Sequence, residues 1–218
     1  MGQQVIVVGL GRFGSAAARE LEALGHEVLA VDANESVIND IAAEVTHAVQ
    51  ADASDEDALR ALGAGQFQNA VVAMSSSVEA SIFATMALKR LGVPRVIAKA
   101  STALHGAILE RIGADRVVYP ESEAGADVAH TLLIPEVIDY IDLAPRFGVA
   151  KIRVPAAFVG RTLRELDLGT RFKVTTLALA QGAAVKVNPH RDEPLREGDF
   201  LLLVGNDDEL AKVTSNID

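Results

Sequence analysis

A glycine-rich turn close to the start of the chain, Gly9-Leu10-Gly11-Arg12-Phe13-Gly14, dictates the architecture more strongly than any other stretch. An apolar run at residues 5–8 precedes it, and an Ala-rich, helix-favouring segment at residues 15–24 follows it. A strand, a glycine turn and a helix in this order are the setting in which G-x-G-x-x-G indicates a dinucleotide or nucleotide site. The start of the chain therefore predicts a βαβ unit with a ligand at its turn.

Each glycine of this turn has its own expected role. Gly9 permits the tight turn, Gly11 lets the backbone approach a pyrophosphate, and Gly14 lets the helix pack closely on the strand. The helix then offers free N–H groups and the positive end of its dipole to the phosphates. A second apolar strand ends in Asp32, where an acid accepts hydrogen bonds from a ribose and disfavours a 2′-phosphate. The turn and Asp32 together predict a nucleotide site that does not favour NADP.

The composition excludes several other classes of protein. The 218 residues are 50% apolar, enough for a buried core, and include no cysteine, which excludes disulfides, thiolate zinc sites and cysteine nucleophiles. The net charge of −10 and the aromatic content of 4% argue against a nucleic-acid partner. No apolar run approaches the roughly 20 residues that span a bilayer, and the N-terminus has no basic region or cleavage site. We therefore expect a cytoplasmic protein.

Strand-like and helix-like segments alternate six times in the first part of the chain. The apolar runs fall at residues 5–8, 27–31, 46–50, 69–74, 96–98 and 116–119. This rhythm predicts right-handed βαβ crossovers and an α/β domain over residues 1–134, built on a Rossmann-like, doubly wound parallel sheet. Ligands of such sheets bind beyond the carboxyl ends of the strands, so the strand-end residues are the candidates for the site.

Polar residues recur at those strand ends. The predicted cofactor-binding set comprises Gly9, Gly11, Arg12, Phe13, Gly14, Asp32, Asp52, Ala53, Ser75, Lys99 and Glu121. Asp32 either accepts hydrogen bonds from a ribose or caps the next helix. Asp52 either caps its own helix or contacts the base. Arg12, inside the turn, either reaches the terminal phosphates of a nucleotide or stays solvated.

Two further strand-end residues have alternatives that involve charge. Lys99 pairs either with a phosphate or with Asp52 or Glu121. Glu121 follows Pro120 at a helix start, where the helix dipole alone favours an acid. The other interpretation places its carboxylate near the phosphates, which is useful only with a metal ion between them. Glu121 is therefore also the candidate metal ligand.

The sequence offers little for catalysis. A dehydrogenase needs a substrate domain and an acid–base residue near the nicotinamide, and none of the five histidines lies in a recognisable catalytic motif. No G-x-S-x-G, H-E-x-x-H or P-loop pattern is present. Ser75 with Lys99 is the only loose candidate for a catalytic pair. We therefore predict a protein that is not an enzyme, with an NAD-dependent oxidoreductase as the alternative.

The pattern changes after residue 134. Strand-like runs at residues 137–143, 149–154, 174–180, 183–187 and 200–204 are joined by turns, and Thr162-Leu163-Arg164-Glu165 is typical of a capping box that opens a short helix. Residues 135–218 are therefore predicted to form a smaller α+β domain. A module of roughly 80 residues buries its core only marginally, so we expect it to pair with a second copy.

The order of these parts resembles the TrkA/KtrA family, the cytosolic regulatory proteins of bacterial potassium uptake systems, and is closest to the KtrA branch. The matching stretches are residues 5–14, 25–32 (Gly-His-Glu-Val-Leu-Ala-Val-Asp), 46–49 (Thr-His-Ala-Val), 112–116, 119–121 (Tyr-Pro-Glu) and 140–143 (Tyr-Ile-Asp-Leu). The resemblance covers nearly the whole chain. It implies an N-terminal RCK domain (regulator of potassium conductance) followed by an RCK_C or TrkA-C domain that regulates and dimerises.

This resemblance implies a nucleotide-gated regulator. Similar RCK subunits form homodimers that assemble into homo-octameric rings at the inner face of the membrane, beneath a TrkH/KtrB-like potassium-translocating subunit. ATP, ADP or NAD(H) binds the N-terminal domain, and whether ATP or ADP is bound controls potassium uptake. A related interpretation is a stand-alone nucleotide sensor that partners a different transporter or antiporter.

The resemblance also implies roles for single residues. The glycines of the turn would cradle the phosphates, and Arg12 would read the γ-phosphate across a subunit contact. Glu121 would lie near the phosphates, with a divalent cation (Mg²⁺ or Ca²⁺) between them. Some relatives bind cyclic di-AMP at the dimer interface of the C-terminal domain through an arginine after a Leu-x-Leu segment. Here Gly169 takes that place and Phe172-Lys173 replaces the usual aromatic-glycine turn, so both departures argue against cyclic di-AMP.

Overall fold

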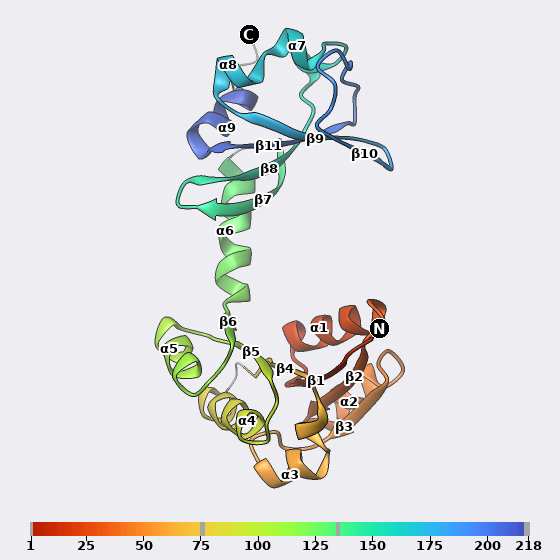
Figure 1. Ribbon diagram of the computed structural model, residues 1–218, viewed down its shortest axis with the longest axis vertical. Helices are drawn as coiled ribbons and strands as arrows, with labels where there is room; N and C mark the ends of the chain where they lie inside the picture. Colours follow the sequence, from red (N-terminus) through yellow and green to blue (C-terminus); the bar gives the residue numbers. More distant parts are fainter. Residues whose placement is uncertain (1, 75–76, 134–135, 216–218) are drawn as a thin grey trace. The chain divides into compact units, whose positions relative to one another are not determined.

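A computed structural model describes residues 2–74, 77–133 and 136–215 of the chain (Figure 1). The chain forms two compact units, residues 1–120 and 121–218. The predicted domain boundary between residues 134 and 135 falls outside the described residues and stays a prediction. Helix α6 (Pro120–Leu133) belongs, after its first residue, to the second unit. No helix in the described part of the chain is both long and apolar enough to cross a membrane.

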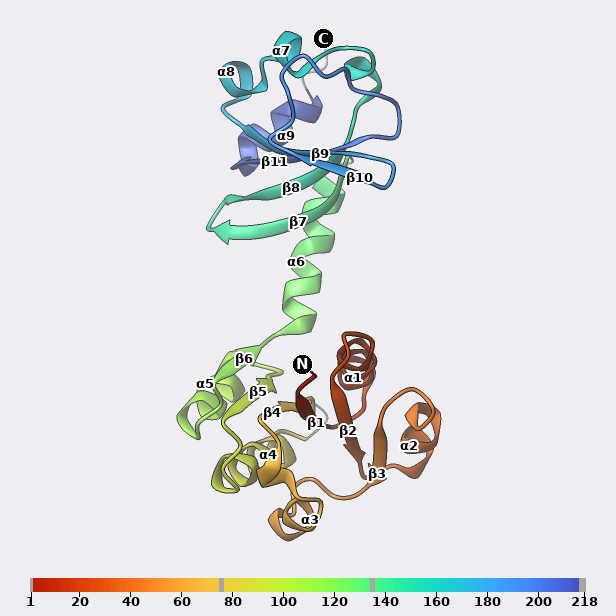
Figure 2. The ribbon, with the colours of Figure 1, turned by 45° about the vertical axis from the view of Figure 1, so that its right-hand side comes forward.

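The first unit is built on a parallel sheet of six strands in the order β3-β2-β1-β4-β5-β6 (Figure 2). The strands are β1 (Gln4–Val8), β2 (Glu27–Asp32), β3 (His47–Gln50), β4 (Asn69–Val72), β5 (Arg95–Lys99) and β6 (Arg116–Val118). The helices are α1 (Arg12–Ala23), α2 (Glu35–Ile41), α3 (Glu56–Ala61), α4 (Val78–Arg90) and α5 (Ala103–Arg111), with a 3₁₀ turn η1 (Ala64–Gln66). This is the strand order of a Rossmann fold, so the predicted doubly wound α/β architecture is confirmed.

Strand β1 shows why the sheet is covered on both faces. Its side chains at residues 5–8 are all buried. Ile6 and Val8 belong to a core shared with α3, α4 and α5, whereas Val5 and Val7 belong to a core shared with α1 and α2. Successive side chains of a strand enter opposite sides of a sheet, so a continuous apolar run is required where helices cover both sides.

The strand order reverses beside β1. The chain passes from β1 to β2 on one side and later returns to β4 on the other side. At such a switch point a crevice opens beyond the carboxyl ends of the strands. The glycine turn follows β1 directly, so the fold places it at this crevice.

The second unit contains an antiparallel sheet of five strands in the order β10-β9-β11-β8-β7. The strands are β7 (Val137–Ala144), β8 (Phe147–Arg153), β9 (Thr175–Gln181), β10 (Ala184–Val187) and β11 (Phe200–Asn206). The other elements are the 3₁₀ turn η2 (Ala156–Phe158) and helices α7 (Leu163–Leu166), α8 (Leu168–Phe172) and α9 (Asp207–Ser215). The predicted α+β class of this part is confirmed.

One detail of the second unit differs from the prediction. Thr162 and Glu165 form the predicted capping box, but the single short helix expected after it is two helices, α7 and α8. Asp167 between them adopts a left-handed backbone with φ of 43°, which interrupts the helical hydrogen bonding. Aspartate is one of the few residues that tolerate this conformation, so the break costs little.

Candidate functional site

The glycine turn is held tightly against the end of β1. Gly9 has a φ of +86°, a backbone conformation that side chains other than glycine rarely adopt, and its N–H donates to the Val31 carbonyl at 2.9 Å. A Cβ atom at Gly14 would lie 1.9 Å from the Gly9 carbonyl oxygen, so only glycine lets α1 start this close to the turn. A Cβ at Gly11 would instead meet no atom within 4 Å. The middle glycine therefore faces the open space in which a ligand can approach the backbone.

The start of α1 is free to bind an anion. Among the described residues, no side chain caps this helix, because its N-cap is Gly11. By contrast, side chains of Asn34, Asp55, Ser77 and Thr102 cap α2, α3, α4 and α5. The first N–H groups of a helix have no intrahelical partner and carry the positive end of the dipole. At α1 these amides remain available for a phosphate.

Asp32 connects the end of β2 to the glycine turn. Its Oδ2 accepts the Leu10 N–H at 2.6 Å, and its Oδ1 accepts the Asn34 N–H at 2.8 Å. The cap of α2 is Asn34, which accepts the Ser36 N–H at 3.0 Å, so the helix-capping alternative for Asp32 is wrong. Each carboxylate oxygen can accept a second hydrogen bond. The half-buried carboxylate is thus fixed in place and retains acceptor capacity for a ribose.

A pocket of about 310 Å³ lies beside the turn. It is lined by Gly9, Gly11, Val31, Asp32, Ala33, Ala51, Asp52, Ala53, Ala73 and Met74. Five predicted residues are among them: the first two glycines of the motif, Asp32, Asp52 and Ala53. The remaining lining residues are apolar and lie at the end of β2 or directly after β2, β3 and β4, so they suit the flat face of a base. These lining residues would have been predicted from the sequence if the apolar residues at the carboxyl ends of the strands had been considered together with the polar ones.

Asp52 does not cap its helix. Its Oδ1 accepts the Ser54 N–H at 2.9 Å and the Ser54 hydroxyl at 2.7 Å, and these bonds lower the pKa of Asp52. Asp55 caps α3 instead, by accepting the Asp57 N–H at 2.9 Å. The capping alternative for Asp52 is therefore wrong. Its carboxylate stays ionised at the mouth of the pocket, and its contact with a base stays a prediction.

Two residues of the turn, Arg12 and Phe13, and one strand-end residue beside it, Lys99, carry a charge or an aromatic ring. Arg12 is exposed at the first position of α1 and forms no ion pair within the described part of the chain. Lys99 is 5% exposed at the end of β5, and its Nζ lies 5.8 Å from the centroid of the Phe13 ring. The fold therefore brings Phe13 and Lys99 together beside the glycine turn, as a cation–π pair.

The last two predicted residues stay untested. Ser75 lies outside the described residues, and with it the suggested pair of Ser75 and Lys99. Glu121 lies in the first turn of α6, in the second unit. Within the described residues, no group of three or more His, Asp or Glu side chains is arranged to hold a metal ion. The predicted contact of Glu121 with phosphates or a cation stays a prediction.

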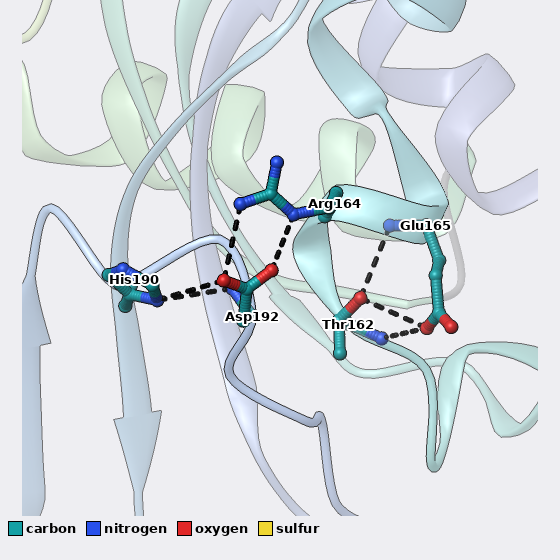
Figure 3. Close-up of polar contacts among 5 residues, drawn as sticks. All are labelled: Thr162, Arg164, Glu165, His190 and Asp192. Carbon is teal, nitrogen blue, oxygen red and sulfur yellow. Dashed lines mark hydrogen bonds and ion pairs between the residues drawn. The ribbon is translucent and has the colours of Figure 1, made fainter.

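The second unit has its own pocket, of about 650 Å³, around Gly169. Arg164 and Arg191 line it, together with residues of α8 and the start of β9. Arg164 Nε donates to Asp192 Oδ1 at 2.5 Å, and His190 Nδ1 lies 3.6 Å from Asp192 Oδ2 (Figure 3). The bond from Arg164 lowers the pKa of Asp192, so the Arg164 guanidinium already has an ionised partner. The charge for a phosphate ligand is therefore partly neutralised here.

Comparisons with known proteins agree with this architecture. The TrkA-N domain family matches residues 5–120 and the TrkA-C domain family matches residues 149–218. The Ktr system potassium uptake protein A of Bacillus subtilis is 34% identical over 210 residues, covering 96% of this chain and 95% of that protein. The Ktr system potassium uptake protein C of the same organism is 32% identical, covering 100% of this chain and 98% of that protein.

Solved structures of GsuK have a similar fold. The GsuK RCK domain matches with a TM-score of 0.57 and 25% identity over 99% of this chain. A GsuK channel bound to NAD matches with a TM-score of 0.66 and 18% identity over 100% of this chain. A structure of GsuK bound to ADP matches with a TM-score of 0.53 and 18% identity over 62% of this chain. This chain covers 46%, 40% and 36% of those GsuK chains, less than half of each. The resemblance proposed from the sequence is confirmed: with a TrkA-N and a TrkA-C domain, the chain belongs to the TrkA/KtrA family of potassium uptake proteins.

Proposed function

We propose that this protein is a nucleotide-sensing gating subunit of a potassium uptake system, and that it is not an enzyme. ATP and ADP are the proposed ligands, with NAD(H) as a further one, and the bound nucleotide controls potassium flux through a separate membrane subunit. Full-length similarity to Ktr system proteins supports the potassium role. GsuK structures bound to NAD and to ADP support a nucleotide in this fold.

The observation that carries the nucleotide role is the pairing of an uncapped helix start with a fixed carboxylate on one pocket. The amides at the start of α1 suit phosphates, and Asp32 suits the ribose hydroxyls. The small residues that follow β2 and β3 leave room for a base. Phosphate, ribose and base therefore each find a chemically matched group at the crevice of the sheet.

Gating requires that two ligands favour different states. A γ-phosphate adds negative charge and acceptor oxygens at the turn, where Arg12 is exposed. We infer that Arg12 engages this phosphate on a neighbouring subunit in one arrangement only. ATP and ADP then differ in their relative affinity for the two arrangements, and this difference shifts their populations. A difference of about 3 kcal/mol shifts the equilibrium roughly 150-fold, within the usual range of allosteric coupling.

The remaining parts of the proposal concern assembly. The protein forms homodimers and a homo-octameric ring, and this ring binds a TrkH/KtrB-like subunit at the cytoplasmic face of the membrane. Glu121 contributes a carboxylate near the phosphates, through Mg²⁺ or Ca²⁺. A pull-down from membranes with the purified protein identifies the partner. Recovery of an antiporter in place of a potassium-translocating subunit would contradict the potassium role and leave the sensor role intact.

The test of the sensor is the ratio of ATP to ADP affinity, measured by titration calorimetry on the full chain. Arg12→Ala is expected to lower ATP affinity at least tenfold and to leave ADP affinity within twofold. Arg19→Ala is the matched control, because Arg19 lies on the same helix but pairs with Glu44 at 2.8 Å, away from the turn. An Arg12→Ala variant with an unchanged ATP/ADP preference would remove this residue from the mechanism.

The enzyme alternative makes a different prediction. An NAD-dependent oxidoreductase oxidises NADH in the presence of its substrate, and absorbance at the nicotinamide band reports this directly. We expect no turnover with a panel of 2-oxo acids, aldehydes and ketones. Turnover that disappears in Lys99→Ala would support the alternative and contradict the regulatory role.

A further inference from the structure

Successive peptide groups of the glycine turn are held in place by hydrogen bonds to neighbouring elements. The N–H of Gly9 donates to the Val31 carbonyl at 2.9 Å. The N–H of Leu10 donates to Asp32 Oδ2 at 2.6 Å. The carbonyl of Leu10 accepts the Ser15 hydroxyl at 2.8 Å. The first two bonds come from β2, so the third peptide group of the turn depends on a side chain from the first turn of α1.

The bond formed by the Ser15 hydroxyl differs from the usual bond of a serine in a helix. Such a serine bonds the carbonyl three or four residues before it, inside its own helix. Here the carbonyl four residues back, that of Gly11, accepts the Ser15 N–H at 2.9 Å. The hydroxyl reaches Leu10, which precedes the helix and belongs to the turn. Ser15 therefore holds two consecutive carbonyls of the turn, those of Leu10 and Gly11, towards α1.

The orientation of the peptide between Leu10 and Gly11 decides what the turn presents to an anion. In a planar trans peptide the C=O and the N–H point in opposite directions. Because Ser15 holds the Leu10 carbonyl, the Gly11 N–H points away from the Ser15 hydroxyl. Gly11 is exposed and lines the pocket beside the turn. A flip of this peptide would replace the N–H by a carbonyl oxygen, which repels a phosphate.

This peptide needs an anchor because Gly11 makes a flip cheap. A flip rotates ψ of Leu10 and φ of Gly11, and glycine populates positive and negative φ about equally. The φ of Gly11 is −66°, and a Cβ at this position would meet no atom within 4 Å. The open space that admits a ligand thus also leaves the peptide free to rotate. The hydrogen bond from Ser15 opposes this rotation.

We propose that Ser15 is a positioning residue of the nucleotide site, whose hydroxyl keeps the peptide between Leu10 and Gly11 in the orientation that offers an N–H to the phosphates. The inference rests on the proposed nucleotide role, and Ser15 acts through the backbone of the turn. The pyrophosphate that approaches this backbone is common to ATP and ADP. Ser15 therefore affects the binding of both nucleotides, whereas Arg12 is proposed to act on the γ-phosphate of ATP.

The test is titration calorimetry with ATP and with ADP on the full chain. Ser15→Ala is expected to lower the affinity for both nucleotides at least fivefold and to keep the ratio of the two affinities within twofold. Ser15→Thr retains a hydroxyl and is expected to keep both affinities within threefold of the parent. Ser36→Ala, the same change at an exposed serine in the first turn of α2, is the matched control and is expected to bind as the parent does.

Urea unfolding without nucleotide separates positioning from a merely structural role. Alanine favours a helix, so the unfolding midpoint of Ser15→Ala is expected to stay close to that of Ser36→Ala. An affinity loss matched by a fall in this midpoint would make the role structural and overturn the proposal. Unchanged affinities in Ser15→Ala, a loss confined to ATP, or equal losses in Ser15→Ala and Ser15→Thr would each overturn it as well. A parent chain that binds neither ATP nor ADP would contradict the proposed function itself.

Discussion

Two alanine substitutions in the glycine turn are expected to separate folding from ligand binding. At Gly14 a methyl group would sit 1.9 Å from the Gly9 carbonyl oxygen, a distance that real Cβ contacts do not show. The helix must therefore move away from the turn by more than 1 Å. Overpacking of a well-packed site typically costs about 1–3 kcal/mol, and so close a contact places this variant at the upper end, about 3 kcal/mol. For a domain of this size that loss corresponds to roughly 10 °C in melting temperature.

At Gly11 the same methyl group has a different consequence. The residue has a φ of −66°, which alanine adopts readily, and the added Cβ would meet nothing within 4 Å. An N-cap glycine replaced by alanine costs only about 1 kcal/mol or less. The methyl group would, however, occupy the space in which a phosphate approaches the helix amides. Gly11→Ala is therefore expected to fold normally and to bind ATP and ADP at least 100-fold more weakly.

The assay pairs urea unfolding with titration calorimetry on both variants. The expected result is a destabilised Gly14→Ala protein and a stable Gly11→Ala protein that has lost its nucleotide. If Gly11→Ala binds ATP as the parent does, the phosphates do not approach the chain at this turn, and the site as we describe it is wrong. If Gly14→Ala is as stable as the parent, the close contact between α1 and the turn is not rigid.

Three further predictions follow from single contacts. Asp32→Asn replaces the carboxylate that accepts the Leu10 N–H, and the loss of charge-assisted hydrogen bonds worth about 1.5–3 kcal/mol is expected to lower the melting temperature and to weaken nucleotide binding. If Asp32 is only a surface acid, neither the melting temperature nor the nucleotide affinity changes. Burial lowers the pKa of His105, because the folded state disfavours the charged form of the ring. The free energy of unfolding is therefore expected to fall as the pH drops below about 6.5 towards that lowered pKa. In urea titrations, His105→Asn is expected to remove this pH dependence, and the control substitution His190→Asn, at an exposed histidine, is expected to keep it. Gly169→Arg has room, since the nearest atom to an added Cβ is 3.8 Å away, and it is expected to increase cyclic di-AMP affinity at least tenfold by calorimetry; unchanged affinity would show that more than the missing arginine excludes this ligand.

The fold was predictable because its main signals are local. The buried run of β1 and the alternation of strands and helices define a parallel sheet without any knowledge of tertiary contacts. The glycine turn was also predictable, because each of its constraints acts within a few residues along the chain. Gly9 and Gly14 contact each other directly, and a pattern of six residues contains both partners.

The parts that the sequence could not decide depend on register or on distant partners. Asp52 and Asp55 are both suitable caps three residues apart, and the turn formed with Ser54 leaves Asp55 as the cap. The bond between Asp32 and the Leu10 N–H joins residues that only the pairing of β1 with β2 brings together. The burial of Lys99 against the Phe13 ring likewise requires β5 and the turn to be placed in three dimensions.

The uncapped start of α1 connects stability to ligand binding. Side chains cap α2 to α5, whereas the N-cap of α1 is Gly11, which has no side chain to form the capping bond that contributes about 1 kcal/mol elsewhere. A bound phosphate supplies the acceptors that Gly11 lacks, so the ligand completes the helix. A ligand at 100 times its dissociation constant then stabilises the folded unit by about 2.7 kcal/mol. Because this stabilisation is exerted at the turn that also carries Arg12, a change in the bound nucleotide acts on the same few residues that face a neighbouring subunit in our proposal.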